Sequence, residues 1–364
     1  MDWIAKELCC GCGVCGAVCP VNAIRMEADD EGFLYPQLDR ITCVDCGLCR
    51  EKCPIMAGKS MRRSQHGIAC YAAHETDRKE LLSCASGGVA TALSRAVLEA
   101  GGWVCGVRYG EDFRSTHYIC TNHPQDLAAL KGSKYIQSQK NGIFPLVRER
   151  LEKGLVLFVG TPCDVGALKG YLGGDHPNLL ACDLICHGIT SPRVGVEYID
   201  HLEESLGAPI ASFTVRHKVD AWYPAYLRGE AENGKTELMP FFDTAYGYAF
   251  SYFLRPSCYR CSFKGENRLG DITLGDYLGM DPEHPGYQRE GVSAVMVNTS
   301  KGLPWMERLS GIELIPVEYG DILSKNKRLS VSSREKPQRN VISRLLPCKG
   351  LLEACREAGW EDPK

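Results

Sequence analysis

The sequence has no long apolar run and no excess of positive charge, and each absence excludes a class of protein. No stretch approaches the roughly 20 apolar residues that cross a bilayer, so we expect no membrane span. The formal net charge is -3, and the lysines and arginines form no basic stripe, which argues against nucleic acid as a partner. Small molecules and other proteins remain as the expected partners.

The first residues also lack the features of a secretion signal. Residues 1–9 contain neither a basic segment nor the apolar segment that follows it in a signal peptide. We therefore expect a cytoplasmic location. In a reducing compartment, the 20 cysteines of this chain indicate metal binding or redox chemistry rather than disulfide bonds.

Two cysteine runs share the spacing CxxCxxCxxxCP, which is typical of a pair of [4Fe-4S] clusters. Three cysteines of each run bind one cluster, and the fourth binds the cluster of the other run. A zinc site or a disulfide framework does not explain this twice-repeated spacing. Such clusters are labile in oxygen, which favours an anaerobic host. The predicted ligands are Cys9, Cys12, Cys15 and Cys19, followed by Cys43, Cys46, Cys49 and Cys53.

Two further motif matches are misleading. Gly11, Gly13 and Gly16 spell GxGxxG, but no strand precedes them, so we predict no dinucleotide site there. Residues 229–236 match the phosphate-loop pattern GxxxxGK[ST], but Asn233-Gly234 is a strong hairpin signal, and Pro240 would interrupt the helix that a phosphate loop requires. We predict a β-hairpin. The radical-SAM spacing CxxxCxxC is absent from the chain.

The order of the segments predicts several units. Residues 1–58 form the two-cluster ferredoxin-like module, and residues 59–66 form a polar linker. Residues 67–150 and 151–335 are the two parts of one larger domain, and residues 336–364 form a helical tail. Strands and helices alternate beyond the linker, and residues 155–159 and 179–185 are apolar throughout, as in strands buried on both faces of an α/β sheet.

Four more cysteines lie where loops are expected. Two follow the apolar strands and two form a CxxC pair, so they suffice for a third [4Fe-4S] cluster or, equally, for a four-cysteine zinc site. Cys182 is an alternative ligand, although packing within its strand is the better interpretation. The candidate ligands are Cys163, Cys186, Cys258 and Cys261. No spacing pattern involves Cys10, Cys70, Cys84, Cys105, Cys120, Cys348 or Cys355, which we expect to be structural.

A flavin is the usual converter between hydride donors and one-electron clusters, so a flavin site is expected. Residues 83–91 open a helix with a serine and two glycines, which permits close approach to a pyrophosphate. Lys134 supplies a cation in the polar loop 131–138. A plain helix cap beside a solvated loop is an equally open interpretation. The candidate FAD-binding residues are Ser86, Gly87, Gly88, Thr91 and Lys134.

His187 and Lys218 are the candidate catalytic residues. His187 directly follows a candidate cysteine ligand, and histidine is the side chain that most readily exchanges a proton near neutral pH. A hydrogen bond from His187 to a cluster sulfur is at least as good an interpretation. Lys218 and the nearby Trp222 are more often a solvated charge and a core aromatic residue.

The motifs SGGVATAL, GSKYIQS, VGTPC, DLICHG, CYRCSFK and LGDITLGDYLG, after the two cysteine runs, resemble the coenzyme F420 hydrogenase/dehydrogenase beta-subunit family. The resemblance covers nearly the whole chain. It implies a flavin-binding α/β domain with a mixed sheet, one FAD, and a [4Fe-4S] cluster beside the flavin. By resemblance, Cys163, Cys186, Cys258 and Cys261 bind that cluster, and Ser86, Gly87, Gly88 and Lys134 surround FAD.

The resemblance also implies an activity. Hydride exchange at FAD with coenzyme F420 or a small organic substrate would be coupled to one-electron transfer through the clusters, with ferredoxin or a hydrogenase/dehydrogenase subunit as redox partner. The sequence has GTPC and GDYLG where members that use F420 tend to have GVPC and GSVG, which makes the substrate uncertain. The alternatives are an electron-relay subunit without its own substrate and a ferredoxin-driven reductase of a sugar or ring substrate.

Overall fold

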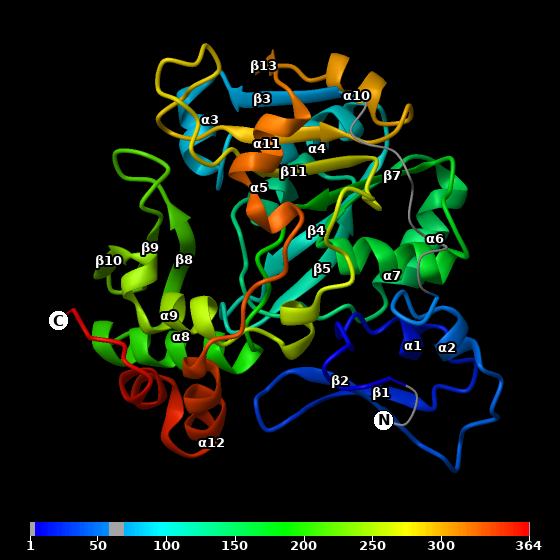
Figure 1. Cartoon of the computed structure of the whole chain (residues 1–364), viewed down its shortest axis with the longest axis vertical. Helices are drawn as coiled ribbons and strands as arrows, with labels where there is room; N and C mark the ends of the chain where they lie inside the picture. Colours follow the sequence, from blue (N-terminus) through cyan, green and yellow to red (C-terminus); the bar gives the residue numbers. More distant parts are fainter. Residues whose placement is uncertain (1–3, 58–68, 364) are drawn as a thin grey trace.

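The computed structural model describes residues 4–57 and 69–363 (Figure 1), so the predicted linker 59–66 lies outside the described residues. An eight-stranded mixed sheet forms the centre of the larger domain. Strands β4, β6, β7 and β11 run parallel, and the other neighbours pair antiparallel. In spatial order the strands are β13 (Ile312–Pro316), β3 (Ala69–Glu75), β12 (Ser293–Val297), β11 (Ile272–Asp276), β7 (Leu179–Leu184), β6 (Val156–Gly160), β4 (Trp103–Tyr109) and β5 (Thr116–Thr121).

Helices cover both faces of this sheet, which explains the apolar strands. In β6, Leu157 packs with Leu93 of α4 (Val89–Glu99), whereas the next residue, Phe158, packs with Val165 of α7 (Pro162–Leu172). Successive side chains of a strand point to opposite faces, so β6 is buried on both sides. The predicted α/β domain with a mixed sheet is confirmed, and residues on both sides of position 150 contribute strands to it.

A smaller antiparallel sheet lies beside the large one. The strands β8 (Ile210–His217), β9 (Tyr226–Ala231) and β10 (Thr236–Pro240) follow one another in sequence and in space. The phosphate-loop match at 229–236 is therefore a β-hairpin, as predicted. None of the helices in the described residues has the length and apolarity of a membrane span.

The other elements connect or flank the sheets. The expected tail helix is α12 (Pro337–Glu357), which lies beside α8 and α9 (Figure 1). The remaining elements are α3 (Arg78–Ser83), η2 (Pro124–Asp126), α5 (Leu127–Leu130), α6 (Ile143–Lys153), α8 (Pro192–Leu206), η3 (Phe241–Asp243), α9 (Ala245–Tyr252), η4 (Pro256–Arg260), α10 (Leu303–Glu307), α11 (Tyr319–Lys325) and η5 (Lys327–Leu329).

The N-terminal module consists of two similar halves. The hairpin of β1 (Ile24–Ala28) and β2 (Leu34–Leu38) separates the short helices α1 (Val14–Ala17) and α2 (Leu48–Glu51). Both helices begin after a left-handed glycine, Gly13 with φ 75° and Gly47 with φ 77°, because the cysteine loop must turn sharply there. The module lies below α7 in Figure 1.

An ion pair joins the tip of this hairpin to the tail helix. Both carboxylate oxygens of Glu31 accept hydrogen bonds from the Arg339 guanidinium, at 2.7 and 2.6 Å, and Ser343 donates another. Burial opposes ionisation of Glu31, but the hydrogen bonds from Arg339 and Ser343 outweigh it and lower the pKa of the carboxyl group. The ion pair therefore fastens residues that are 308 positions apart.

We predict that Glu31→Gln lowers the free energy of unfolding at pH 7 by about 2 kcal/mol, because Arg339 loses a largely buried charged partner. The folded-state pKa of Glu31 is depressed, so its contribution exists above the unfolded-state pKa and disappears as the pH falls through the folded-state pKa. The difference in the free energy of unfolding between the original protein and Glu31→Gln should therefore shrink as the pH falls. Anaerobic urea unfolding measures it, with the exposed Glu27→Gln of the same hairpin as control. An equal loss in both variants would contradict the prediction.

Candidate metal centres

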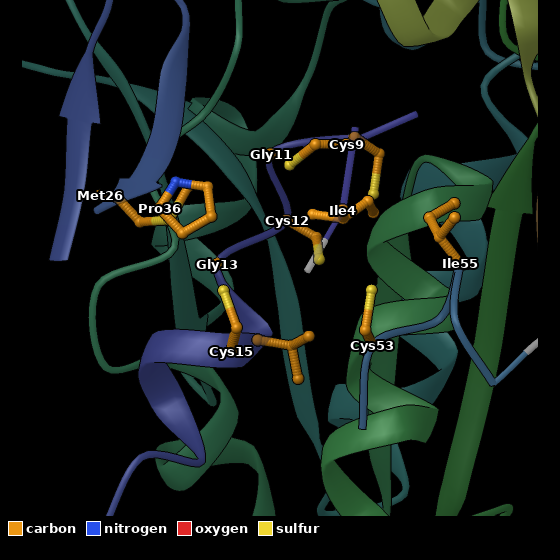
Figure 2. A pocket seen from close by; sticks show the side chains of 12 residues that line it. Ile4, Cys9, Gly11, Cys12, Gly13, Cys15, Met26, Pro36, Cys53 and Ile55 are labelled. Atoms are coloured by element: carbon orange, nitrogen blue, oxygen red, sulfur yellow. The ribbon is translucent and has the colours of Figure 1, made fainter. Parts of the chain in front are cut away.

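Five cysteines of the N-terminal module line one cavity of about 330 Å³, and four of them are predicted cluster ligands. Cys9, Cys12 and Cys15 come from the first run, and Cys53, the fourth cysteine of the second run, joins them. Their side chains are arranged around a common space in Figure 2. This is the crossed arrangement of a two-cluster ferredoxin.

Burial makes this cavity unfavourable for thiolates without a cation. Burial and the neighbouring Cys9 and Cys53 thiols raise the pKa of Cys15 to about 12. Burial likewise raises the pKa of Cys53. Iron compensates thiolate charge, so this donor set fits a [4Fe-4S] cluster.

The other four candidate ligands of the module are more accessible to solvent. Cys46 is exposed, and Cys19, Cys43 and Cys49 are partly buried. Two of their sulfurs accept backbone hydrogen bonds, from Ala23 N to Cys19 Sγ at 3.2 Å and from Asp45 N to Cys43 Sγ at 3.5 Å. This second set of cysteines therefore lies near solvent, whereas the first set faces the protein interior.

The four candidate ligands beyond the module line a second cavity, of about 590 Å³. Cys163 follows β6 and Cys186 follows β7, and the carboxyl ends of these parallel strands meet at one edge of the sheet. Cys258 and Cys261 come from the segment at η4. Cys163 lies in the first turn of α7 and not in a loop, because Thr161 and Pro162 start the helix there.

The second cavity also combines buried thiols with a cation. Burial raises the pKa of Cys186 to about 12, and Cys163 and Cys261 add to the rise, whereas Lys264 opposes it. The Lys264 ammonium donates hydrogen bonds to the carbonyl oxygens of Cys186 and Arg328. Four thiols thus lie within one another's electrostatic field, as a metal centre requires.

Sequence reasoning missed three residues of these cavities. Cys10, which we expected to be structural, lines both cavities, and Ile55 does the same. Arg255 lines the second cavity and donates a hydrogen bond to the carbonyl of Cys9, 2.8 Å away. The signals were slight, namely a cysteine directly after a ligand and a charged residue before the CxxC pair. Cys182, in contrast, is fully buried in β7 among core side chains.

His187 lines the second cavity, and its ring lies 5.1 Å from that of Phe250. Burial lowers the pKa of His187 to about 4, and the charges of Arg328 and Lys264 act in the same direction. The imidazole is therefore neutral at pH 7. A neutral imidazole has one N–H to donate.

The candidate flavin segment is packed closely against the sheet. The Ser86 hydroxyl donates to the carbonyl of Val292, and the Gly87 N–H donates to Ser293 Oγ, both at 3.0 Å. A Cβ at Gly87 would lie 2.1 Å from the carbonyl oxygen of Ala73. Helix α4 begins after Gly88, with φ 90° and no side-chain cap. The first N–H groups of α4 are therefore the available donors.

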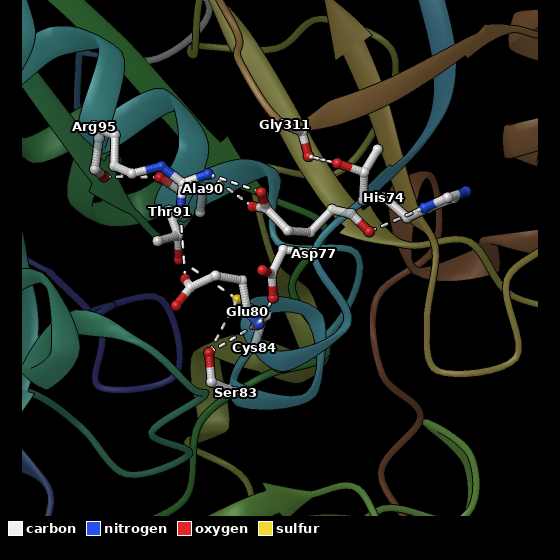
Figure 3. Close-up of polar contacts among 12 residues, drawn as sticks. His74, Asp77, Glu80, Ser83, Cys84, Ala90, Thr91, Arg95 and Gly311 are labelled. Atoms are coloured by element: carbon white, nitrogen blue, oxygen red, sulfur yellow. Dashed lines mark hydrogen bonds and ion pairs between the residues drawn. The ribbon is translucent and has the colours of Figure 1, made fainter.

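Charged residues surround the start of α4 (Figure 3). Arg95 forms two hydrogen bonds with Glu75, at 2.9 and 2.8 Å, which neutralise the carboxylate nearest Gly88. Glu80 accepts from Lys131 at 2.7 Å. The Thr91 hydroxyl lies 3.7 Å from the Cys84 sulfur.

The two candidate lysines bind backbone carbonyls. Lys218 is buried, contrary to the solvated position that we considered, and donates to the carbonyls of Leu81 and Ser86 at 2.7 Å each. Burial lowers the pKa of Lys218 to about 8. Lys134 donates to the carbonyls of Ala129 in α5 and of Lys131 and Gly132, and burial lowers the pKa of Lys134 to about 7. Trp222 is partly buried, and the Arg216 guanidinium lies 5.9 Å from the Trp222 ring centroid.

We predict that Gly11→Ala is more destabilising than Gly13→Ala. Both glycines are left-handed, so each substitution costs about 1–2 kcal/mol of backbone strain. At Gly11 the new Cβ would also lie 2.3 Å from Gln137 Nε2 and 2.7 Å from Arg255, which adds about 1–3 kcal/mol. Met26, 3.8 Å away, is the nearest group at Gly13. Anaerobic urea unfolding of both variants measures the difference, and equal losses would contradict the prediction.

Two family models match the chain in the segments that contain the cysteines. Residues 8–57 match the 4Fe-4S dicluster domain. Residues 154–318 match the model for the C terminus of the coenzyme F420 hydrogenase/dehydrogenase beta subunit. All twelve candidate cysteine ligands fall in these two segments.

The comparisons with individual proteins are more distant. No curated protein matches the chain. A similar solved structure is a chain from the xenon-derivatised F420-reducing [NiFe] hydrogenase complex of Methanosarcina barkeri. The identity is 18%, the match covers 72% of this chain and 91% of that chain, and the TM-score is 0.49.

Proposed function

Because this chain belongs to the coenzyme F420 hydrogenase/dehydrogenase beta-subunit family and carries a 4Fe-4S dicluster domain, it is an iron-sulfur oxidoreductase that transfers electrons, and we propose a more specific activity. It exchanges hydride between FAD and coenzyme F420 or a small organic substrate, and passes single electrons through three [4Fe-4S] clusters. The convergence of Cys163, Cys186, Cys258 and Cys261 on one cavity carries the proposal.

The geometry of these four cysteines favours a cluster over zinc. A single zinc ion needs four thiolates at about 2.3 Å. Among the described residues, no three histidine, cysteine or acidic side chains converge closely enough to hold one metal ion. The four cysteines instead line one open cavity, which fits thiolates that bind separate iron atoms of a cluster.

The shared lining of the two cavities supports electron transfer between them. Cys10 and Ile55 line both cavities, so the two sets of ligands lie on either side of the same two residues. The second set of ferredoxin cysteines, which includes the exposed Cys46, is closest to solvent. We propose that the redox partner, a ferredoxin or a hydrogenase/dehydrogenase subunit, exchanges electrons there.

The segment from Ser83 to Thr91 is the proposed FAD site. A bound flavin supplies the step from two-electron to one-electron chemistry. The uncapped N–H groups of α4 fit a pyrophosphate. Lys218 holds the loop before α4 in place through the carbonyls of Leu81 and Ser86, and no carboxylate pairs with its ammonium among the residues that the structure describes. Gly87 and Gly88 keep the backbone close to the sheet.

The proposed role of His187 follows from its position on the wall of the second cavity, directly after the candidate ligand Cys186. From there its imidazole can donate an N–H to a cluster sulfur and thereby stabilise the reduced cluster. Lys218 and Lys134 are positioning residues in this proposal, because their ammonium groups bind loop carbonyls.

We predict about twelve iron atoms and one FAD per chain in anaerobically purified protein. Cys258→Ser should lower the iron content by about four atoms, because it removes a ligand of the third cluster. Cys182→Ser is the matched control, since this cysteine lies in β7 within the core, and it should leave the iron content unchanged. Iron, zinc and flavin analysis measures all three proteins.

Other results would contradict the proposal in distinguishable ways. About eight iron atoms with one zinc would replace the third cluster by a structural zinc site. Twelve iron atoms without flavin would indicate an electron-relay subunit that lacks its own substrate.

We predict that Lys218→Met weakens FAD binding by tenfold or more and leaves the iron content unchanged. The substitution leaves the carbonyl of Ser86 without its donor, at a cost of about 1–3 kcal/mol, and the carbonyl of Leu81 keeps only the N–H of Cys84. Lys153→Met, in an exposed last turn of α6, is the control. Fluorescence titration of the deflavinated protein with FAD measures binding. Unchanged affinity in Lys218→Met would place the flavin elsewhere.

A further inference from the structure

Arg255 is a fully buried cation at the junction of the two cavities. Its side chain is 0% exposed, and its guanidinium donates to the carbonyls of Cys9 and Leu34, at 2.8 and 3.0 Å, and to Gln137 Oε1 at 3.0 Å. The guanidinium also lies 3.9 Å from the Cys9 sulfur. Arg255 itself lines the second cavity. It therefore connects a ligand of the first cavity to the wall of the second.

The other buried arginines of the described chain have carboxylate partners. Arg268 pairs with Asp183 at 2.8 Å, and Arg339 pairs with Glu31 at 2.6 Å. Arg216, which is 9% exposed, pairs with Asp276 at 3.0 Å. Within the residues that the structure describes, no carboxylate pairs with Arg255. Because a buried charge without a countercharge is costly, a negative group is expected beside it.

The absence of a side chain at Gly11 leaves the space that the Arg255 guanidinium occupies. Gly11, in the left-handed conformation, lies against the guanidinium, and a Cβ there would be 2.7 Å from it. At the corresponding position of the second cysteine run stands Asp45, with φ 51°, so the backbone alone does not demand glycine. The first run uses glycine because Arg255 and Gln137 occupy the space.

We propose that Arg255 supplies the countercharge of the cluster bound by Cys9, Cys12, Cys15 and Cys53, and raises its reduction potential above that of the other ferredoxin cluster. The inference rests on the proposed cluster sites. Four thiolates outweigh the positive charge of a [4Fe-4S] core, and reduction adds one electron. The guanidinium remains protonated in both states, so no proton accompanies that electron.

The environment of the two ferredoxin sites explains why only one responds. A buried cation acts through a low dielectric and stabilises the more negative, reduced cluster. Cys46, at the other site, is exposed, so water screens charges around it. An electron that enters the module should therefore reside mainly on the inner cluster, the one that Cys9, Cys12, Cys15 and Cys53 bind.

Arg255→Gln tests the proposal in the full, anaerobically purified chain. Redox titration with dithionite, followed by electron paramagnetic resonance, should show one cluster whose equilibrium constant for reduction falls tenfold or more, a shift of about 59 mV for one electron. The cluster near the exposed Cys46 should stay unchanged. Cys46→Ala removes a ligand of the other ferredoxin cluster, the outer cluster. The resonance that this variant loses is the one whose potential must not change in Arg255→Gln.

Arg339→Gln is the matched control, because Arg339 is also buried and also binds the N-terminal module, but through Glu31 and not through a cysteine. It should leave all potentials unchanged. An equal shift in both variants would overturn the proposal, because loosened docking would then be the cause. The proposal would also be overturned if Arg255→Gln kept its full iron content and left all potentials unchanged.

Gln137→Glu provides a second test that retains Arg255. It places a carboxylate where Gln137 Oε1 now accepts from the guanidinium, and thus supplies the partner that other buried arginines have. The potential of the inner cluster should fall, as in Arg255→Gln. If Arg255→Gln does not retain iron, Gln137→Glu is the test of the proposal. An unchanged potential of the inner cluster in Gln137→Glu would then overturn the proposal. Loss of iron in both variants would assign Arg255 a purely structural role and would also overturn it.

Discussion

Burial of several cysteine thiols within one another's electrostatic field is the constraint on which the rest of the structure depends. Burial raises the pKa of Cys15 and of Cys186, so neither thiol ionises readily alone. In the proposed function, a metal cluster replaces the protons and makes the arrangement favourable, since iron compensates thiolate charge. The cations nearby, Arg255 and Lys264, then face a centre with net negative charge.

The fold brings the two cavities together from distant parts of the chain. The parallel strands β6 and β7 end at one edge of the sheet, and Cys163 and Cys186 follow them. The ferredoxin-like module docks against this edge, and it is fastened by Arg255, which precedes η4, and by Arg339 of the tail helix. In the proposed function, the contact between the module and the larger domain is therefore part of the redox site.

The sequence predicted those features that depend on local spacing. The cysteine runs, the apolar strands and the hairpin at 229–236 follow from residue types at short separations, and the structure has the expected elements. The convergence of Cys163 with Cys258 needs the three-dimensional path of the chain, because 95 residues (258 − 163) separate them. Burial of Lys218 and of Arg255 was equally invisible, since neither residue has a local pattern.

Iron anomalous diffraction from anaerobically grown crystals tests the central claim most directly. The account predicts three compact iron peaks: one among Cys9, Cys12, Cys15 and Cys53, one near the exposed Cys46, and one in the cavity of about 590 Å³ that Cys163 lines. Iron at the two ferredoxin positions alone, with no iron in the second cavity, would contradict the account.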